Sequence, residues 1–317
     1  MNKLKGIICL GEALIDFVPL DMDNISYQKS PGGAPANVAV GAAKLGANSA
    51  FVGTVGADVM GEFLYDTLAQ YNVNVEKMNK VTTHQTNLVF VKNDTNGERS
   101  FSFYIPNSAD QQLSENDINE DFFKKYKIVH YGSISLIHEP IHNAHLKAIQ
   151  VAKQHGLICS YDPNLRMSLW KDEGHAKETI LSIMPEADVL KVSEEELAFL
   201  TGETDIPRGI EALSQYNISV ILVTLGSEGS YVSTKGEIRH VPARKVKAVD
   251  TTGAGDAFMS GILYNINEYN KPIEQITIDE LVEFAKFASV SGALAASTKG
   301  AMTALPSINE VQNQLNM

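Results

Sequence analysis

The sequence predicts an α/β protein built on a doubly wound, mostly parallel β-sheet. Short apolar runs that end in turn signals recur along the 317 residues, namely KGIICLG, SAFVGTVG, KIVHYGS, LICSYDP, ADVLKVS and SVILVTLG. Amphipathic stretches lie between several of them, namely PANVAVGAAKLG, GEFLYDTLAQYN, IHNAHLKAIQVAKQHG and SEEELAFLTG. Because strands that alternate with helices are joined by crossover connections, we expect a parallel sheet with helices on both faces.

Several helix boundaries are predicted by local chemistry. Ser193 is followed three residues later by Glu196, which is a capping box and marks a helix start. Pro35 suits an early helical position because its missing N–H is not needed there. An alanine-rich pattern from about 278 to 298 predicts a long helix, and Gly300 marks the turn that follows it.

Two segments break the alternation of strands and helices. Residues from about 13 to 31 and from about 84 to 106 are polar, aromatic and rich in β-formers. In the second segment, Asn96-Gly97 predicts the turn of a hairpin. We expect these segments to form a small strand subdomain outside the main sheet. Since no repeat or linker divides the chain, residues 1–317 are expected to be one domain with these two insertions.

Composition excludes several classes of protein. The chain is 44% hydrophobic and 20% charged, and its net charge of −12 disfavours non-specific nucleic-acid binding. No apolar run approaches the ~18 residues of a membrane span. Cys9 and Cys159 each lie in a strand-like apolar run, which favours two buried reduced thiols in a cytoplasmic protein.

The stretch DTTGAGDAF, at 250–258, carries the main chemical signal. Glycines let consecutive N–H groups gather at one point, and a helix N-terminus adds partial positive charge there. Such a turn suits a transferring phosphoryl group, and Asp256 directly behind it suits a base that takes the proton of an acceptor hydroxyl. A simpler interpretation, in which Asp256 only complements a first helical turn, stays open on this motif alone.

A second glycine turn occurs near the start, in SPGGAPANVAVGAAKLG at 30–46. Gly32 and Gly33 permit close backbone approach to a ligand, and Asn37 falls in the first turn of the predicted helix. With Asp16 upstream, these are the groups that a site uses to bind vicinal hydroxyls. A turn and helix cap without any ligand is the alternative. The chain contains no Walker A string, so a P-loop kinase is not expected.

Six motifs occur in this order along the chain: GE-x-x-x-D, PGGAPANVA, DPNLR-x-x-LW, KVSEEE, VTLGSEG and DTTGAGDAF. On these motifs, the sequence resembles the ribokinase-like (PfkB) carbohydrate kinases almost end to end. Within that family it is most similar to the fructokinases. The resemblance implies a doubly wound α/β domain with a small β lid, and ATP-dependent phosphorylation of a sugar primary hydroxyl, fructose to fructose 6-phosphate. Other acceptors remain open: 2-keto-3-deoxygluconate, ribose or a nucleoside. So does a non-catalytic sensor on the same fold.

The resemblance also implies roles for individual residues. Asp256 matches the catalytic base, and Gly253, Ala254 and Gly255 match the anion hole for the γ-phosphoryl group. The implied sugar contacts are Asp16, Gly32, Gly33, Asn37, Arg166 and, from the lid, Phe101 and Phe103. A surface arginine after an Asp-Pro turn is the alternative interpretation of Arg166.

On the nucleotide side, the resemblance implies contacts with ATP and Mg²⁺. The matching positions are Thr224, Gly226, Gly229 and Gly300, with Lys191 and Ser289 where the family commonly has asparagine. Glu194 matches the glutamate that organises Mg²⁺ through water, although it also suits a first-turn acid. Asp250 and Thr252 match positions that bind a monovalent cation, so K⁺ is a candidate second ion.

One departure bears on the acceptor. Fructokinase lids usually carry an arginine after the FxFY stretch, whereas this chain has Ile105. The identity of the sugar is therefore open, while the phosphoryl-transfer residues are unaffected. Because lid strands expose unpaired edges, we expect a homodimer that covers them between two subunits.

Overall fold

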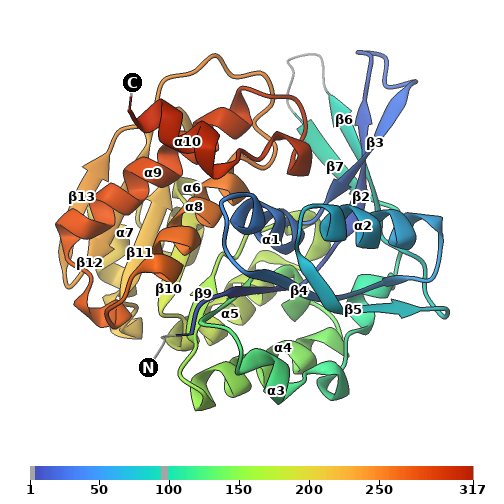
Figure 1. Cartoon of the computed structure of the whole chain (residues 1–317), viewed down its shortest axis with the longest axis horizontal. Helices are drawn as coiled ribbons and strands as arrows, with labels where there is room; N and C mark the ends of the chain where they lie inside the picture. Colours follow the sequence, from blue (N-terminus) through green and yellow to red (C-terminus); the bar gives the residue numbers. More distant parts are fainter. Residues whose placement is uncertain (1–3, 94–98, 317) are drawn as a thin grey trace.

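The computed structural model describes residues 4–93 and 99–316, which fold around a nine-stranded sheet (Figure 1). From one edge to the other, its strands are β13 (Glu237–Val241), β12 (Ser230–Thr234), β11 (Val220–Thr224), β10 (Val189–Ser193), β9 (Ile158–Tyr161), β8 (Ile128–Tyr131), β1 (Ile7–Leu10), β4 (Ser49–Gly56) and β5 (Asn74–Val81). All neighbouring pairs from β5 to β11 are parallel, and β12 is antiparallel to both of its neighbours.

Helices cover both faces of this sheet, as the strand–helix alternation predicts (Figure 1). Side chains of α1 (Ala34–Lys44), α2 (Val59–Gln70), α8 (Ala254–Glu268) and α9 (Ile278–Ala296) share one core cluster with Ile7 and Cys9 of β1. The opposite cluster contains Ile8 and Leu10 of β1 with side chains of α3 (Glu120–Phe123), α4 (Ile141–Gln154), α5 (Glu173–Ile183), α6 (Glu194–Thr201) and α7 (Ile206–Ala212). A short C-terminal helix, α10 (Ile308–Leu315), packs on α9. The alternation along β1 is what a strand buried on both faces requires.

The two strand-rich segments form a separate four-stranded sheet. Its order is β3 (Tyr27–Gly32), β2 (Leu14–Pro19), β6 (Leu88–Asn93) and β7 (Arg99–Phe103). The central pair, β2 and β6, is parallel, and the two outer pairs are antiparallel. In Figure 1 this sheet projects from the main body beside α1 and α2. The predicted Asn96-Gly97 turn lies outside the described residues.

Most of the predicted elements are confirmed. Each of the six apolar runs contains a strand, and the four amphipathic stretches correspond to α1, α2, α4 and α6. Ser193 and Glu196 form the reciprocal capping box at the start of α6. Pro35 lies at the start of α1, and Cys9 and Cys159 are buried free thiols. Strands β5, β12 and β13 are not predicted. Charged residues interrupt the apolar pattern of β5 and β13, which are the edge strands, and three of the five residues of β12 are Ser or Thr.

Within the described ranges, we find no helix long and apolar enough to cross a membrane.

Close packing between α1 and α8 brings their N-terminal ends together. A Cβ atom at Gly41 would overlap the side chain of Ser260, so only glycine lets the two helices approach this closely. The Ser260 hydroxyl donates to the carbonyl oxygens of Val38, in α1, and Asp256, in α8. Since Asn37 and Asp256 lie in the first turns of these helices, the crossing aligns the two predicted site residues.

Candidate active site

A pocket of about 340 Å³ lies where the carboxyl ends of the parallel strands face the small sheet. Loops that follow β1, β8 and β9 contribute to its wall, together with Lys191 of β10, as expected for the binding crevice of an open α/β sheet. The predicted site residues that line it are Asp16, Gly33, Asn37, Phe101, Phe103, Arg166, Lys191, Thr252, Gly253, Gly255 and Asp256. Tertiary folding thus gathers residues from four distant parts of the chain around one cavity.

The glycine turn forms the floor of this pocket at the start of α8. Gly253 has φ +77°, a left-handed conformation that residues with a side chain rarely adopt, and it is the N-cap of the helix. The N–H of Ala254 donates to the carbonyl of Thr251 at 3.2 Å, and Ala254 does not line the pocket. Gly253 and Gly255 do line it, so they present the helix N-terminus to a bound anion.

Asp256 is held by a residue from the other end of the chain. The side-chain amide of Asn37 donates a hydrogen bond to Oδ2 of Asp256 at 2.8 Å. The sequence predicts that both residues are near the ligand, but nothing in it predicts this contact, because 219 positions separate them. A carboxylate fixed at the mouth of a helix N-terminus is well oriented to take a proton from a group bound above the glycine turn.

The small sheet supplies the opposite wall. In its register, Asp16 pairs with Val89, and Val89 pairs with Phe103, so all three side chains lie on the same face. A Cβ atom at Gly32 would overlap the carboxylate of Asp16, which puts the first glycine of the pair directly against this acid. Phe101 and Phe103 are half-buried and line the pocket beside Asp16.

Arg166 closes one side of the pocket. Its guanidinium lies 5.7 Å from the ring centroid of Phe101, a cation–π contact between the main body and the small sheet. Its Nη1 donates to the carbonyl of Leu165 at 3.1 Å, and the N–H of Leu165 donates to Oε1 of Glu196 at 2.6 Å. Glu196 therefore does more than cap α6, because it also fixes the loop that carries Arg166.

Lys191 and Asp162 form a buried ion pair beside the glycine turn. Nζ of Lys191 donates to Oδ2 of Asp162 at 2.6 Å, and the two residues are only 7% and 4% exposed. A Cβ atom at Gly255 would lie 3.7 Å from Nζ, so the ammonium borders the helix N-terminus. Sequence reasoning missed Asp162, although it is the first residue of the quoted DPNLR motif.

Sequence reasoning also missed Glu12, which lines the same pocket. It is 4% exposed, and its Oε1 accepts from the N–H of Ala34 at 3.2 Å. The available signal was its position in GE-x-x-x-D, where a charged residue occurs two positions after a buried strand.

Burial raises the pKa values of three carboxyl groups that line the pocket, those of Asp256, Asp16 and Glu12. It raises the pKa of Asp256 to about 6, an effect that the hydrogen bond from Asn37 opposes. Burial likewise raises the pKa of Asp16 to about 7, against the opposing charge of Arg166. For Glu12, burial and the nearby Asp110 raise the pKa to about 8. A cluster of raised carboxyl pKa values in a cleft is typical of functional sites.

The predicted nucleotide contacts are more dispersed. Thr224 lines a neighbouring cavity of about 570 Å³ that also touches Lys191 and Gly255, so the two cavities meet at the glycine turn. Four further predicted positions line neither cavity: Gly226, Gly229, Ser289 and Gly300. Ser289 Oγ accepts from the N–H of Arg244 at 3.1 Å, which ties α9 to the loop before the glycine turn.

The predicted cation ligands differ in their surroundings. Glu194 is exposed and lines neither cavity, whereas its neighbour Glu195 lines the larger one. Asp250 is buried, and its two oxygens accept from the N–H groups of Thr252 and Gly300 at 2.9 and 3.1 Å. Across residues 4–93 and 99–316, no group of three or more His, Cys, Asp or Glu side chains suits a metal ion.

Comparison with known proteins gives a consistent result. The family model described as pfkB family carbohydrate kinase matches residues 4–308. Probable fructokinase-6, chloroplastic, from Arabidopsis thaliana is 45% identical over 98% of this chain and 82% of its own length.

Solved structures agree over the whole chain. Fructokinase with bound ATP from Xylella fastidiosa is 34% identical, covers 99% of both chains and superposes with a TM-score of 0.93. A double mutant of fructokinase from Vibrio cholerae O395, in a form bound to fructose, ADP and potassium ion, is 37% identical over 99% of both chains, with a TM-score of 0.90. With a family match over nearly its full length and an acid at the N-terminus of α8 in the predicted position, the chain belongs to the pfkB family of carbohydrate kinases.

Proposed function

We propose that this chain is an ATP-dependent fructokinase that converts fructose to fructose 6-phosphate. The observation that carries the proposal is the position of Asp256 in the pocket of about 340 Å³, which we call the acceptor pocket. Asp256 lines it from the first turn of α8, beside Gly253 and Gly255. Full-length similarity to fructokinases supports fructose as the acceptor.

In this proposal, Asp256 accepts the proton of the C6 hydroxyl while that oxygen attacks the γ-phosphorus of ATP. A pKa of about 6 leaves Asp256 mostly ionised at neutral pH and still close enough to the operating pH for efficient proton transfer. The α8 N-terminus and the Lys191 ammonium hold negative charge on the transferring group. The products are the sugar phosphate, ADP and a proton on Asp256 that leaves to solvent.

Sugar binding is assigned to the opposite wall. Asp16, Asn37 and the backbone at Gly33 bind hydroxyls, and Arg166 adds donors. Gly32, which does not line the pocket, is assigned to the same wall because it lies directly against Asp16. We propose that the four-stranded sheet acts as a lid within a single domain, with Phe101 and Phe103 covering the sugar. Excluding water is important because an open site would hydrolyse ATP.

ATP is assigned to the larger cavity and the loops next to it, with Thr224, Gly226, Gly229, Ser289 and Gly300 along its path. The positive end of α8 and the buried ammonium of Lys191 fit its phosphates. Mg²⁺ would neutralise phosphate charge, and Glu194 would hold it through water. Asp250 and Thr252 are assigned to a K⁺ ion, because a buried carboxylate at the start of the glycine turn suits a cation.

We further propose a cytoplasmic homodimer that associates through the lid. The lid face opposite the pocket carries stacked aromatic rings: Phe17 and Phe90 lie 4.7 Å apart, and Tyr104 packs on Phe90 at 4.8 Å. Tyr104 is 61% exposed, so a second subunit would bury apolar surface there. Sedimentation of the wild type and Tyr104→Ser tests this, and a wild-type monomer at micromolar concentration would contradict it.

A second candidate acceptor is 2-keto-3-deoxygluconate, which is favoured by the guanidinium of Arg166 on the pocket wall. An assay of ADP release against fructose, ribose, nucleosides and 2-keto-3-deoxygluconate distinguishes these candidates. We expect the largest kcat/KM for fructose. A larger value for another acceptor would replace fructose, and saturable sugar binding without turnover would instead indicate a sensor.

A further inference from the structure

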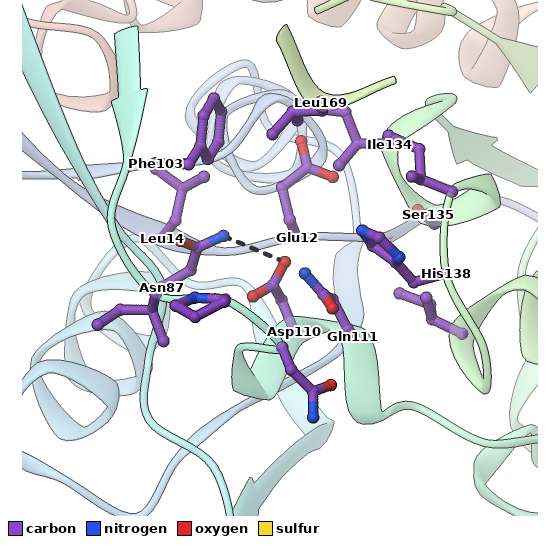
Figure 2. Close-up of a pocket in the computed structure, with 15 residues that line it drawn as sticks. Glu12, Leu14, Asn87, Phe103, Asp110, Gln111, Ile134, Ser135, His138 and Leu169 are labelled. Atoms are coloured by element: carbon purple, nitrogen blue, oxygen red, sulfur yellow. Dashed lines mark hydrogen bonds between the residues drawn. The ribbon is translucent and has the colours of Figure 1, made fainter. Parts of the chain in front are cut away.

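A second chamber adjoins the acceptor pocket (Figure 2). Its volume is about 460 Å³, and it shares the wall residues Glu12, Leu14, Phe103 and Ile134 with the acceptor pocket. The glycine turn and Asp256 line the acceptor pocket and not this chamber. The chamber therefore meets that pocket along a wall separate from the phosphoryl-transfer groups.

The chamber contains polar atoms that have no partner among the described residues. They are Oε2 of Glu12, Oδ1 of Asn87, Oδ1 of Asp110 and Oγ of Ser135, on residues that are 4%, 6%, 4% and 2% exposed. All four residues line the chamber. Because buried polar atoms are nearly always hydrogen-bonded, these atoms are available to a molecule that enters. The amide oxygen of Asn87 and the carboxyl oxygen of Asp110 are acceptors, so they suit a ligand that donates hydrogen bonds.

Charge further restricts what the chamber accepts. Asp110 is 4% exposed, and its Oδ2 accepts from Nδ2 of Asn87 at 3.5 Å, a contact that Figure 2 shows with Gln111 beside it. With Glu12, two acids line the chamber, and the described lining contains no lysine or arginine. Ile105 is part of this lining, and His138 stands at its exposed rim. An anionic group would enter beside two buried acids without a lysine or arginine partner, which is strongly unfavourable.

We propose that the chamber is a second subsite for the acceptor, one that receives a hydrogen-bond-donating, non-anionic substituent far from the phosphorylated carbon. The inference rests on the proposed function, since it assumes that the reacting hydroxyl lies at Asp256. For a hexulose phosphorylated at C6, the substituent at C1 is at the other end of the carbon chain. The chamber then selects a hydroxymethyl or aminomethyl group at C1 and rejects a carboxylate there.

Three hexuloses that differ only at C1 test this: fructose, 1-amino-1-deoxyfructose and 2-ketogluconate. Their affinities are measured by titration calorimetry without ATP, on the wild type and on Asp110→Asn, which removes one acid with little change in shape. We expect the preference for the amine over the acid to fall by about 10-fold or more in Asp110→Asn. Thermal melting checks that the variant is folded.

Gln111→Lys provides the reciprocal change, because it adds a cation to the chamber wall and should raise affinity for 2-ketogluconate relative to the amine. Asp121→Asn, whose carboxylate is 88% exposed outside the chamber, is the matched control and should leave the preference unchanged. Equal preferences in the wild type, Asp110→Asn and Gln111→Lys would overturn the second subsite. Because calorimetry needs no turnover, a failure to phosphorylate fructose would contradict the proposed function alone.

Discussion

The side-chain amide of Asn37 and the carboxylate of Asp256 are joined by a 2.8 Å hydrogen bond between the first turns of α1 and α8. One residue belongs to the N-terminal glycine motif and the other to the C-terminal glycine motif. The bond orients the carboxylate and stabilises its ionised form, because an amide N–H forms a stronger hydrogen bond with a charged carboxylate oxygen than with a neutral carboxyl oxygen. This hydrogen bond thus links the residues proposed to bind the acceptor to those proposed to bind the phosphoryl group.

Replacing Asp256 by asparagine should lower kcat by at least ~10²-fold, because the amide cannot take the proton of the acceptor hydroxyl. Steady-state ADP release measures this, and circular dichroism checks the fold. Asp279→Asn is the matched control, since Asp279 is 87% exposed and lies outside the pocket. Near-normal turnover in Asp256→Asn would remove this residue from the role of base.

The pH profile should reflect the surroundings of Asp256. Since only the ionised carboxylate accepts a proton, kcat/KM should fall as pH drops through about 6, the raised pKa of this group in the free protein. Asn37→Ala removes a hydrogen bond that lowers that pKa, so the acid limb should move to higher pH. Asn79→Ala serves as control, because that amide binds Asp117 away from the pocket. An unmoved acid limb in Asn37→Ala would separate the profile from Asp256.

The buried acid Glu12 should make the fold less stable at alkaline pH. Its pKa rises from 4.5 to about 8 on folding, so the folded chain binds the extra proton between these values. Stability therefore declines as pH rises through this window and does not recover above pH 8. Glu12→Gln lacks this titration. The unfolding free energy of Glu12→Gln relative to that of the wild type should therefore increase by roughly 1–4 kcal/mol between pH 5 and 9. Denaturant titrations at both pH values measure it, with the 67% exposed Glu283→Gln as control.

Substitutions in the buried pair of Lys191 and Asp162 should affect the stability of the fold and the activity differently. Asp162→Asn leaves a buried ammonium without its counter-charge and should lower the unfolding free energy by about 3–5 kcal/mol. Adding Lys191→Met to that variant removes the unpaired charge and should restore most of this loss. Activity should stay at least ~10²-fold low in the double variant, since the cation beside the transferring phosphoryl is gone. Full activity there would mean that Lys191 only stabilises the fold.

Much of the architecture follows from local signals in the sequence. The runs IICL and LICSY predict strands buried on both faces, and the Ser193–Glu196 capping box predicts where α6 begins. Periods of two and 3.6 residues, and the chemistry of helix ends, are properties of a few neighbouring residues. For the same reason, the sequence indicates the two glycine turns and the acid behind one of them.

Only the tertiary structure decides which of these residues meet. The contact between Asn37 and Asp256 depends on the Gly41–Ser260 crossing, and the Lys191–Asp162 pair depends on the adjacency of β9 and β10. The role of Glu12 emerges only when the Asn87–Asp110 chamber forms around it. Such contacts join positions far apart in the chain. The burial and the pKa of each side chain depend on the neighbours that folding brings to it, and no short stretch of sequence encodes those neighbours.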